Sequence, residues 1–93
     1  MIRSFRDKEA EKIFHGDRSL QLPQAIQKTA YRKLHMLKNA RELRDLSAFR
    51  GNHFEKLLGD RKGQFSICVN DQYRICFEWR SGDAYNVEIV DYH

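Results

Sequence analysis

The chain has 93 residues, of which 41% are apolar and 32% are charged, and it carries a formal net charge of +4. A chain of this length has a thin core, so we expect residues 1–93 to form a single domain without room for a large enclosed cofactor. No apolar run approaches the ~20 residues that span a bilayer, and Met1–Asp7 lacks the apolar core of a signal peptide, so a cytoplasmic protein is expected.

The first forty residues carry the signals of a short strand and two helices. Weak alternation over 1–5 indicates the strand, and Asp7 is a suitable N-cap for a helix that ends at Gly16. A second helix is predicted to begin at Pro23 and to end near Asn39. Apolar residues at spacings of four, four and three predict its buried stripe, Ile26, Ala30, Leu34 and Leu37. Three basic residues are expected to lie away from that stripe, Lys28, Arg32 and Lys33.

The second half of the chain is predicted to form strands. Residues 41–53 show little periodicity, whereas 65–69, 75–79 and 85–89 alternate between apolar and polar side chains, as strands of a half-buried sheet do. The connections between these segments are short and polar, which is typical of hairpins. Helices followed by an antiparallel meander predict an α+β domain, with two N-terminal helices packed on one face of the sheet.

The first hairpin has a predicted register. A three-residue loop at 70–72 places Phe65 opposite Phe77 and Ile67 opposite Ile75 on one apolar face. The opposite face then carries Ser66, Cys68, Arg74, Cys76, Glu78 and Arg80. We expect this second face to be polar, uncovered by helices and open to a ligand.

Basic residues are concentrated in one segment. Residues 28–62 hold ten Lys and Arg side chains against four Asp and Glu, a net charge of +6, whereas the rest of the chain is at −2. Such a segment indicates a polyanionic partner, either a nucleic acid or an acidic protein. A solvated basic surface without a partner is the alternative.

Two groups of residues could carry chemistry. The chain ends in Asp91-Tyr92-His93, where the Asp91 carboxylate and the terminal carboxylate would favour the protonated imidazole, and Tyr92 offers a stacking face. Arg74 lies inside a predicted strand on the polar face and could bind a phosphate through two parallel hydrogen bonds. The alternatives are a terminus without a role and a cross-strand ion pair of Arg74, for instance with Glu78 or Glu88.

The two cysteines, Cys68 and Cys76, are too few for a disulfide framework and lack the spacing of zinc ligands. We expect both to be free thiols that serve packing. Neither a metal site nor a cofactor is predicted, and no nucleophile motif indicates Ser-type hydrolysis.

An ordered set of short motifs runs through the second half of the chain. The set consists of Gly51-Asn52, Gly59-x-Arg61-x-Gly63-Gln64, Val69-Asn70-Asp71-Gln72, Tyr73-Arg74-Ile75-Cys76-Phe77 and the ending Val87-Glu88-Ile89-Val90-Asp91-Tyr92-His93. Together with the Met-Ile-Arg-Ser-Phe start, these motifs make the chain resemble the HigB-type toxins of the RelE/ParE superfamily, which belong to bacterial type II toxin–antitoxin systems. The likeness covers nearly the whole chain.

The resemblance implies a compact microbial-ribonuclease-like (RelE-like) domain. It also implies a metal-independent endoribonuclease that cleaves mRNA in the ribosomal A site by attack of the 2′-hydroxyl and so inhibits translation. The catalytic residues that it implies are Arg74, Asp91, Tyr92 and His93. In these roles His93 would be the general acid or base, Arg74 would stabilise the phosphorane charge, Asp91 would hold the imidazole, and Tyr92 would stack on the nucleotide.

The same resemblance implies the partners. A cognate HigA-type helix-turn-helix antitoxin is expected, together with the ribosome (rRNA) and mRNA; no membrane is involved, and DNA is contacted only indirectly through the antitoxin. Salt-sensitive phosphate contacts would dock the basic segment on rRNA. The residues expected to bind the ribosome are Lys28, Arg32, Lys33, Lys56, Arg61 and Lys62.

The chain departs from the family pattern near the expected site. His53 and Cys68 stand where family members often have Arg, and in the stretch before Gly59 only Lys56 or His53 could supply the further catalytic group that some relatives place there. Fewer bases near the site predict a weak nuclease, with His53 as an accessory residue. A non-catalytic ribosome- or nucleic-acid-binding growth inhibitor and a ParE-like DNA gyrase inhibitor are the alternative functions.

Overall fold

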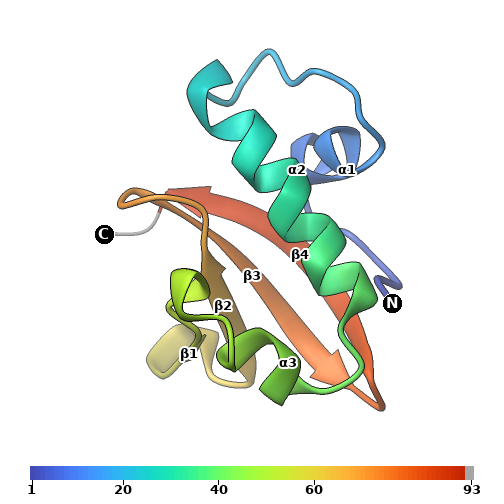
Figure 1. The fold of residues 1–93 in the computed structure, drawn as a ribbon, viewed down its shortest axis with the longest axis vertical. Coiled ribbons are helices and arrows are strands. Elements are labelled where there is room, and N and C mark those ends of the chain that lie inside the picture. Colours follow the sequence, from blue (N-terminus) through green and yellow to red (C-terminus); the bar gives the residue numbers. More distant parts are fainter. Residues whose placement is uncertain (92–93) are drawn as a thin grey trace.

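The computed structural model describes residues 1–91, in which helices pack on an antiparallel sheet (Figure 1). The helices are α1 (Lys8–Phe14), α2 (Gln24–Asn39) and α3 (Leu43–Ser47), with the short 3₁₀ turns η1 (Arg50–Asn52) and η2 (Gly59–Arg61). The strands are β1 (Glu55–Lys56), β2 (Gln64–Cys68), β3 (Tyr73–Arg80) and β4 (Asp83–Asp91), and they lie in that order across one sheet. The predicted α+β class is confirmed. Within residues 1–91, none of the helices has the length and apolar character to cross a membrane.

Local sequence signals place the first two helices as predicted. The Asp7 side chain caps α1 by accepting a hydrogen bond from the Glu9 backbone N–H at 2.9 Å, and the chain leaves this helix through Gly16, whose φ of +86° favours glycine. α2 begins directly after Pro23. All four residues of its predicted stripe are buried in the core, Ile26, Ala30, Leu34 and Leu37.

A third helix, α3, lies where the sequence showed no periodicity. It has five residues, too few for an apolar repeat to be visible. A capping box begins it, because the Asp45 carboxylate accepts hydrogen bonds from the backbone N–H groups of Arg41 at 2.9 Å and Glu42 at 3.1 Å. These bonds lower the pKa of the Asp45 carboxyl. The helix buries Leu46 against the core, where it fixes the chain that leads to η1.

The sheet has the register that the hairpin pattern predicts. Phe65 lies opposite Phe77 and Ile67 lies opposite Ile75, on the face that the helices cover. The β3–β4 ladder shifts by one residue between Cys76 and Glu78, where β4 contains Asn86 in a left-handed conformation with φ of +53°. The shift does not alter which face of the sheet each side chain occupies near Arg74, where the pairs Tyr73–Asp91 and Arg74–Val90 are in regular register.

The N-terminal segment protects the β4 edge of the sheet. The predicted strand over 1–5 is present as two isolated parallel bridges, between Ile2 and Ala84 and between Phe5 and Val87, and not as a continuous strand. Backbone hydrogen bonds from the N–H groups of Arg3 and Arg6 to β4 carbonyls, at 2.8 and 3.0 Å, hold it there. An edge with its carbonyls satisfied in this way is closed to pairing with another chain.

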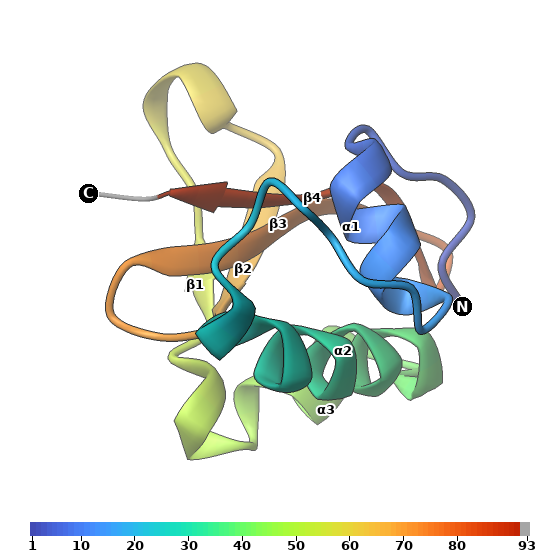
Figure 2. The ribbon, with the colours of Figure 1, turned by 90° about the horizontal axis from the view of Figure 1, so that it is seen from above.

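The second face of the sheet is polar, as predicted, but it is covered over Ser66 and Cys76 and is open to a ligand beside the β2–β3 hairpin. Ser66 and Cys76 are fully buried and Arg74 is only 9% exposed. The segment from His53 to Arg61 covers this face; Figure 2 shows its η2 turn (yellow) on the side of the sheet away from α2. Strand patterning predicts which face a side chain occupies but not what loop folds over it.

The apolar core between α2 and the sheet should account for most of the stability, and Leu34 lies at its centre with no exposed surface. We predict that Leu34→Ala lowers the free energy of unfolding by about 2–5 kcal/mol, because it removes buried methyl groups and leaves a cavity. Urea denaturation followed by circular dichroism measures this change. The matched control is Leu20→Ala, at a leucine that is 87% exposed, which should change stability by less than about 0.5 kcal/mol. Equal losses in the two variants would contradict this assignment of the core.

Candidate active site

A cavity of about 300 Å³ opens at the end of the β2–β3 hairpin, on the second face of the sheet. β2 contributes Cys68, and β3 contributes Arg74. Loop residues complete the lining, with Asn70 and Asp71 from the hairpin connection and His53 and Glu55 from the chain around the start of β1. The cavity therefore brings together one guanidinium, one imidazole and two carboxylates from three separate parts of the chain.

Arg74 is fixed by acceptors on two sides. Its Nε donates to the Ser66 hydroxyl at 2.7 Å, and its Nη2 donates to the His53 carbonyl. Its Nη1 lies 3.6 Å from the Glu55 carboxylate. Burying a cation is costly unless its donors are satisfied, and a guanidinium held by several partners cannot reorient freely. The arrangement presents a positive charge of fixed position to the cavity.

The His53 backbone has an unusual conformation that serves this arrangement. His53 follows η1 with φ of +42° and ψ of +53°, a left-handed conformation that costs energy for a residue with a Cβ atom. This turn aims the carbonyl at Arg74, while the exposed imidazole belongs to the wall of the cavity. The structure thus brings His53, the predicted accessory residue, next to Arg74.

Glu55 is a site residue that the sequence did not reveal. It lies in β1, opposite Ser66 in the neighbouring strand, so its side chain emerges beside the guanidinium. Its side chain is 52% exposed, which leaves the carboxylate accessible from the cavity. In the stretch 54–58 the family pattern points to a basic group, and the two-residue strand that orients Glu55 is too short to give a pattern in the sequence.

Asp91 lies apart from the Arg74 cavity. It pairs with Tyr73 across the β3–β4 ladder, while Arg74 pairs with Val90, and neighbouring residues of a strand face opposite sides of a sheet. Its carboxylate accepts a hydrogen bond from the Gln72 side chain at 2.9 Å. Of the four predicted catalytic residues, Tyr92 and His93 lie outside the described residues, so the structure relates only Arg74 and Asp91 and places them on different faces.

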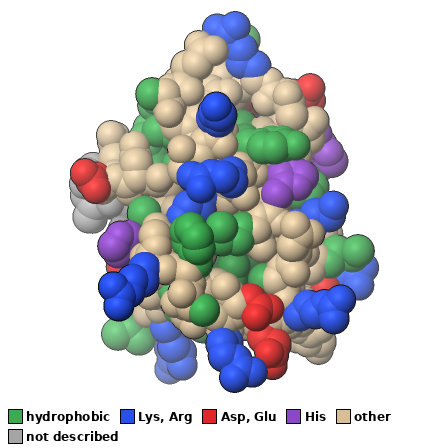
Figure 3. All heavy atoms as spheres, in the orientation of Figure 1, with side chains coloured by type: hydrophobic (Ala, Val, Ile, Leu, Met, Phe, Trp, Pro, Cys, Tyr) green, Lys and Arg blue, Asp and Glu red, His purple; other side chains and the backbone are tan. Residues whose placement is uncertain are grey.

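The predicted ribosome-binding residues fall into three groups. Four are exposed, Lys28, Arg32, Lys56 and Lys62, and Figure 3 shows Lys and Arg side chains spread down the face that carries α2. Arg61 is engaged within the domain, because its Nη1 lies 3.1 Å from both the Glu88 carboxylate and the Gln64 side-chain oxygen. The prediction that Lys33 lies on the exposed basic face is wrong, since it is 4% exposed with its ammonium bonded to the η1 turn.

The cysteines are free thiols, as predicted. Cys76 is buried below the site, and this burial raises the pKa of its thiol, which keeps it protonated and unreactive. Among residues 1–91, no group of three or more His, Cys, Asp and Glu side chains is arranged to share a metal ion. Metal independence of the activity stays a prediction.

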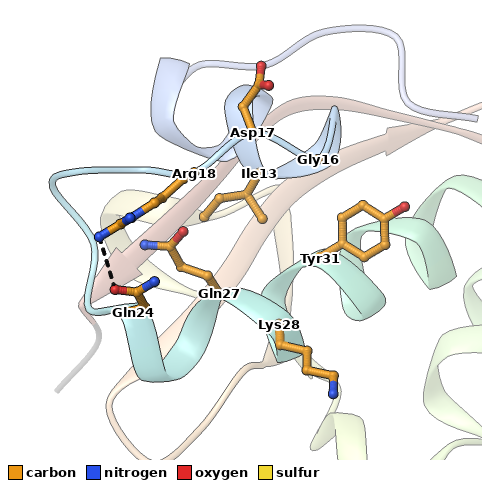
Figure 4. A pocket seen from close by; sticks show the side chains of 8 residues that line it. All are labelled: Ile13, Gly16, Asp17, Arg18, Gln24, Gln27, Lys28 and Tyr31. Atoms are coloured by element: carbon orange, nitrogen blue, oxygen red, sulfur yellow. Dashed lines mark hydrogen bonds between the residues drawn. The ribbon is translucent and has the colours of Figure 1, made fainter.

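A second, larger cavity lies between α2 and the loop that follows α1. It has a volume of about 580 Å³, and Figure 4 shows Arg18 hydrogen-bonded to Gln24 at its rim, at 3.2 Å. Amide, phenol and cationic groups dominate its polar lining, and Asp17 is its one carboxylate. An acid–base pair beside a fixed cation is found in the Arg74 cavity instead, which makes that cavity the candidate active site.

Comparison with known proteins identifies the family. Residues 3–93 match the family described as the RelE-like toxin of type II toxin–antitoxin system HigB. Toxin HigB-1 of Vibrio cholerae serotype O1 is 41% identical over 87 residues, which are 92% of each chain. Endoribonuclease HigB of Proteus vulgaris is 31% identical over 93 residues, the full length of both chains, and an uncharacterized protein of Haemophilus influenzae is 30% identical over 84 residues. The chain belongs to the HigB-like toxins, the RelE-like toxin components of type II toxin–antitoxin systems.

Proposed function

We propose that this toxin is an endoribonuclease that cleaves mRNA on the ribosome, in the cytoplasm, and so stops translation. The observation that carries the proposal is Arg74, a buried guanidinium fixed beside a carboxylate in an open cavity. A fixed cation next to a proton acceptor is what phosphodiester cleavage requires of a protein. The relative from Proteus vulgaris, which aligns over its full length, is named an endoribonuclease.

RNA supplies its own nucleophile, so the protein has only to move protons and stabilise charge. In the proposed reaction the 2′-oxygen forms a bond to phosphorus while its proton passes to the Glu55 carboxylate. Arg74 stabilises the negative charge that develops on the phosphoryl oxygens. The bond from phosphorus to the 5′-oxygen breaks, and His93 donates a proton to that oxygen. The products are a 2′,3′-cyclic phosphate and a free 5′-hydroxyl.

The remaining predicted residues take supporting roles in this proposal. Tyr92 stacks on the nucleotide, and the His53 imidazole contacts the substrate from the wall of the cavity, whereas Asp91 faces the opposite side of the sheet and has no role at Arg74 in this proposal. The roles of Tyr92 and His93 rest on the family resemblance. For the general base, which the sequence left open, we propose Glu55, because its exposed carboxylate lies 3.6 Å from Arg74 Nη1 in the lining of the cavity.

Docking on the ribosome completes the substrate site in this proposal. A cavity of about 300 Å³ contacts little more than the reacting phosphate, so the mRNA must be positioned by something larger. The exposed basic residues Lys28, Arg32, Lys56 and Lys62 would contact rRNA phosphates. Lys33 leaves this set because it is buried, and Arg61 leaves it because Glu88 holds it within the domain.

Membership of a toxin–antitoxin family implies an antitoxin partner. We propose a HigA-type antitoxin with a helix-turn-helix domain, through which the toxin contacts DNA only indirectly. Its surface should be acidic where it meets the basic segment 28–62, because charge complementarity steers such complexes. A neighbouring gene that encodes such a protein would support the assignment.

We predict that Arg74→Lys and His93→Ala each reduce cleavage of ribosome-bound mRNA by about 10²-fold or more. Lysine keeps the charge but loses the planar fork, and alanine removes the proton donor. The measurement is 5′-end mapping of mRNA on programmed ribosomes, with mRNA alone as the control for ribosome dependence. Growth arrest on induction without any cuts from the unaltered toxin would overturn the nuclease proposal in favour of binding or gyrase inhibition.

Glu55→Gln should lower kcat by roughly 10²- to 10⁴-fold, because the amide preserves the shape of the carboxylate but cannot accept the proton. Single-turnover cleavage with saturating ribosomes measures this step. Glu11→Gln is the matched control, at an exposed carboxylate of α1 far from the cavity lining. A Glu55→Gln variant that is as active as the control would show that another group is the base.

Arg32→Glu should weaken association with the ribosome and reduce the slope of log affinity against log salt by about one, because one phosphate contact is lost. Co-sedimentation with ribosomes at several salt concentrations measures both quantities. Lys8→Glu, at an exposed lysine of α1 outside the basic segment, makes the same charge change and should leave the slope unaltered. Equal slopes for the two variants would show that the outer face of α2 does not contact rRNA.

A further inference from the structure

Lys33 is a buried ammonium on α2 whose partners are uncharged. Its Nζ donates to the Gly51 carbonyl at 3.0 Å and to the Asn52 side-chain oxygen at 2.6 Å, and it lies 5.2 Å from the centre of the Phe49 ring. A lysine that is only 4% exposed is unusual, because its charge loses most of its hydration. Both acceptors belong to η1, the turn that leads into the candidate active site.

Asn52 extends this contact to a second helix, α3, and adds another contact to α2. It is fully buried, and its amide nitrogen donates to the Leu46 carbonyl at 2.9 Å and approaches the Met36 sulfur at 3.3 Å. The amide therefore uses its oxygen on Lys33 and its nitrogen on α3 and α2. Each polar side-chain atom of Lys33 and Asn52 has a hydrogen-bond partner, and these bonds fix η1 against α2 and α3.

The next residue along the chain is the one that holds Arg74. His53 is left-handed, with φ of +42°, and its carbonyl accepts a hydrogen bond from Arg74 Nη2. A strained residue keeps such a conformation only when its surroundings fix it. The fixed neighbour here is Asn52, so a continuous series of contacts runs from the Lys33 ammonium through the backbone of 51–53 to the guanidinium.

The cost of burying the Lys33 charge indicates that the charge has a role beyond packing. The pKa of Lys33 is lowered, mainly by burial; the nearby Cys68 opposes this shift, and Arg32 and Arg74 add to it. A methionine or leucine would fill this position without that cost, so packing alone does not explain a lysine. An ammonium instead provides strong donors to two acceptors of one turn.

We propose that Lys33 is a positioning residue that holds the His53 carbonyl, and through it the Arg74 guanidinium, in place for the reacting phosphate. The expected effect on kcat rests on the proposed ribonuclease function, whereas the expected effect on the position of Arg74 does not. Lys33 touches no substrate in this account. Its effect is on the placement of another residue, where an error of about 1 Å is enough to cost up to 10²-fold in rate.

The test compares Lys33→Met with Lys38→Met, two variants that remove one positive charge from the same helix. Lys38 is exposed near the end of α2 and lies outside the contacts described above. Thermal unfolding first establishes that each variant is folded. Cleavage of mRNA on programmed ribosomes then gives kcat and KM separately, and the Nε–H signal of Arg74 in ¹H–¹⁵N spectra, assigned with Arg74→Lys, reports the guanidinium itself.

In Lys33→Met we expect kcat to fall about 10- to 10²-fold with KM within about twofold, and the Arg74 Nε–H to exchange with water at least about tenfold faster. Lys38→Met, whose charge belongs to the basic segment, should leave kcat and the exchange rate of the Arg74 Nε–H as in the unaltered protein, whatever its effect on KM. If Lys33→Met does not fold, Lys33→Gln, which keeps one donor for the same acceptors, takes its place with smaller shifts in the same directions.

Two outcomes would overturn the proposal. A folded variant with an unaltered Arg74 signal and unaltered kcat shows that η1 holds the arginine without Lys33. A variant that raises KM with kcat unchanged shows that Lys33 acts in docking. An unaltered toxin that cuts no mRNA defeats the ribonuclease proposal, and the exchange rate of the Arg74 Nε–H then decides the positioning role by itself.

Discussion

The burial of the Arg74 guanidinium is the constraint on which the second face of the sheet depends. A cation that is 9% exposed requires acceptors that replace its hydration, and each acceptor comes from a different element. Ser66 supplies a hydroxyl from β2, Glu55 a carboxylate from β1, and His53 a carbonyl from the turn before β1. The left-handed backbone of His53 and the pairing of β1 with β2 each bring an acceptor to this one side chain.

The same constraint explains how so small a domain covers both faces of its sheet. The helices cover one face with apolar side chains, and within residues 1–91 no further α-helix is present for the other. The segment from His53 to Arg61 covers the second face with polar contacts instead, including the pair of Arg61 with Glu88 at 3.1 Å. Small side chains at Ser66 and Cys76 let this segment approach closely.

The parts of the structure that the sequence predicted are those that local patterns determine. The β2–β3 register followed from alternation and from the three-residue loop, which Asn70 closes by accepting hydrogen bonds from the backbone N–H groups of Gln72 and Tyr73. The face of Arg74 was predicted for the same reason. Its burial was not, because that depends on a left-handed His53 far along the chain, which no periodicity signals.

Lys33 shows why a helical pattern alone was insufficient. It follows Ile26 by seven residues and Ala30 by three, and it precedes Leu37 by four, so its position belongs to the buried stripe. A charged side chain is expected at the surface, and the Lys33 ammonium can be buried because two acceptors of η1 bind it. Glu55 was not predicted because its position belongs to no apolar pattern. Its carboxylate becomes a site residue through the Arg74 guanidinium beside it, which the sequence does not place there.

The ion pair of Glu55 with Arg74 also bears on how the proposed reaction would begin. At 3.6 Å and with a half-exposed carboxylate, the pair is held loosely compared with the bond from Arg74 to Ser66 at 2.7 Å. A phosphate oxygen that approaches Nη1 would compete with the Glu55 carboxylate for the same donor. It would displace this carboxylate more easily than it would displace the Ser66 hydroxyl from Nε. Binding of the phosphate would thus place the charge to be stabilised against Arg74 and free the Glu55 carboxylate, which is half-exposed in the cavity, to reach the 2′-hydroxyl.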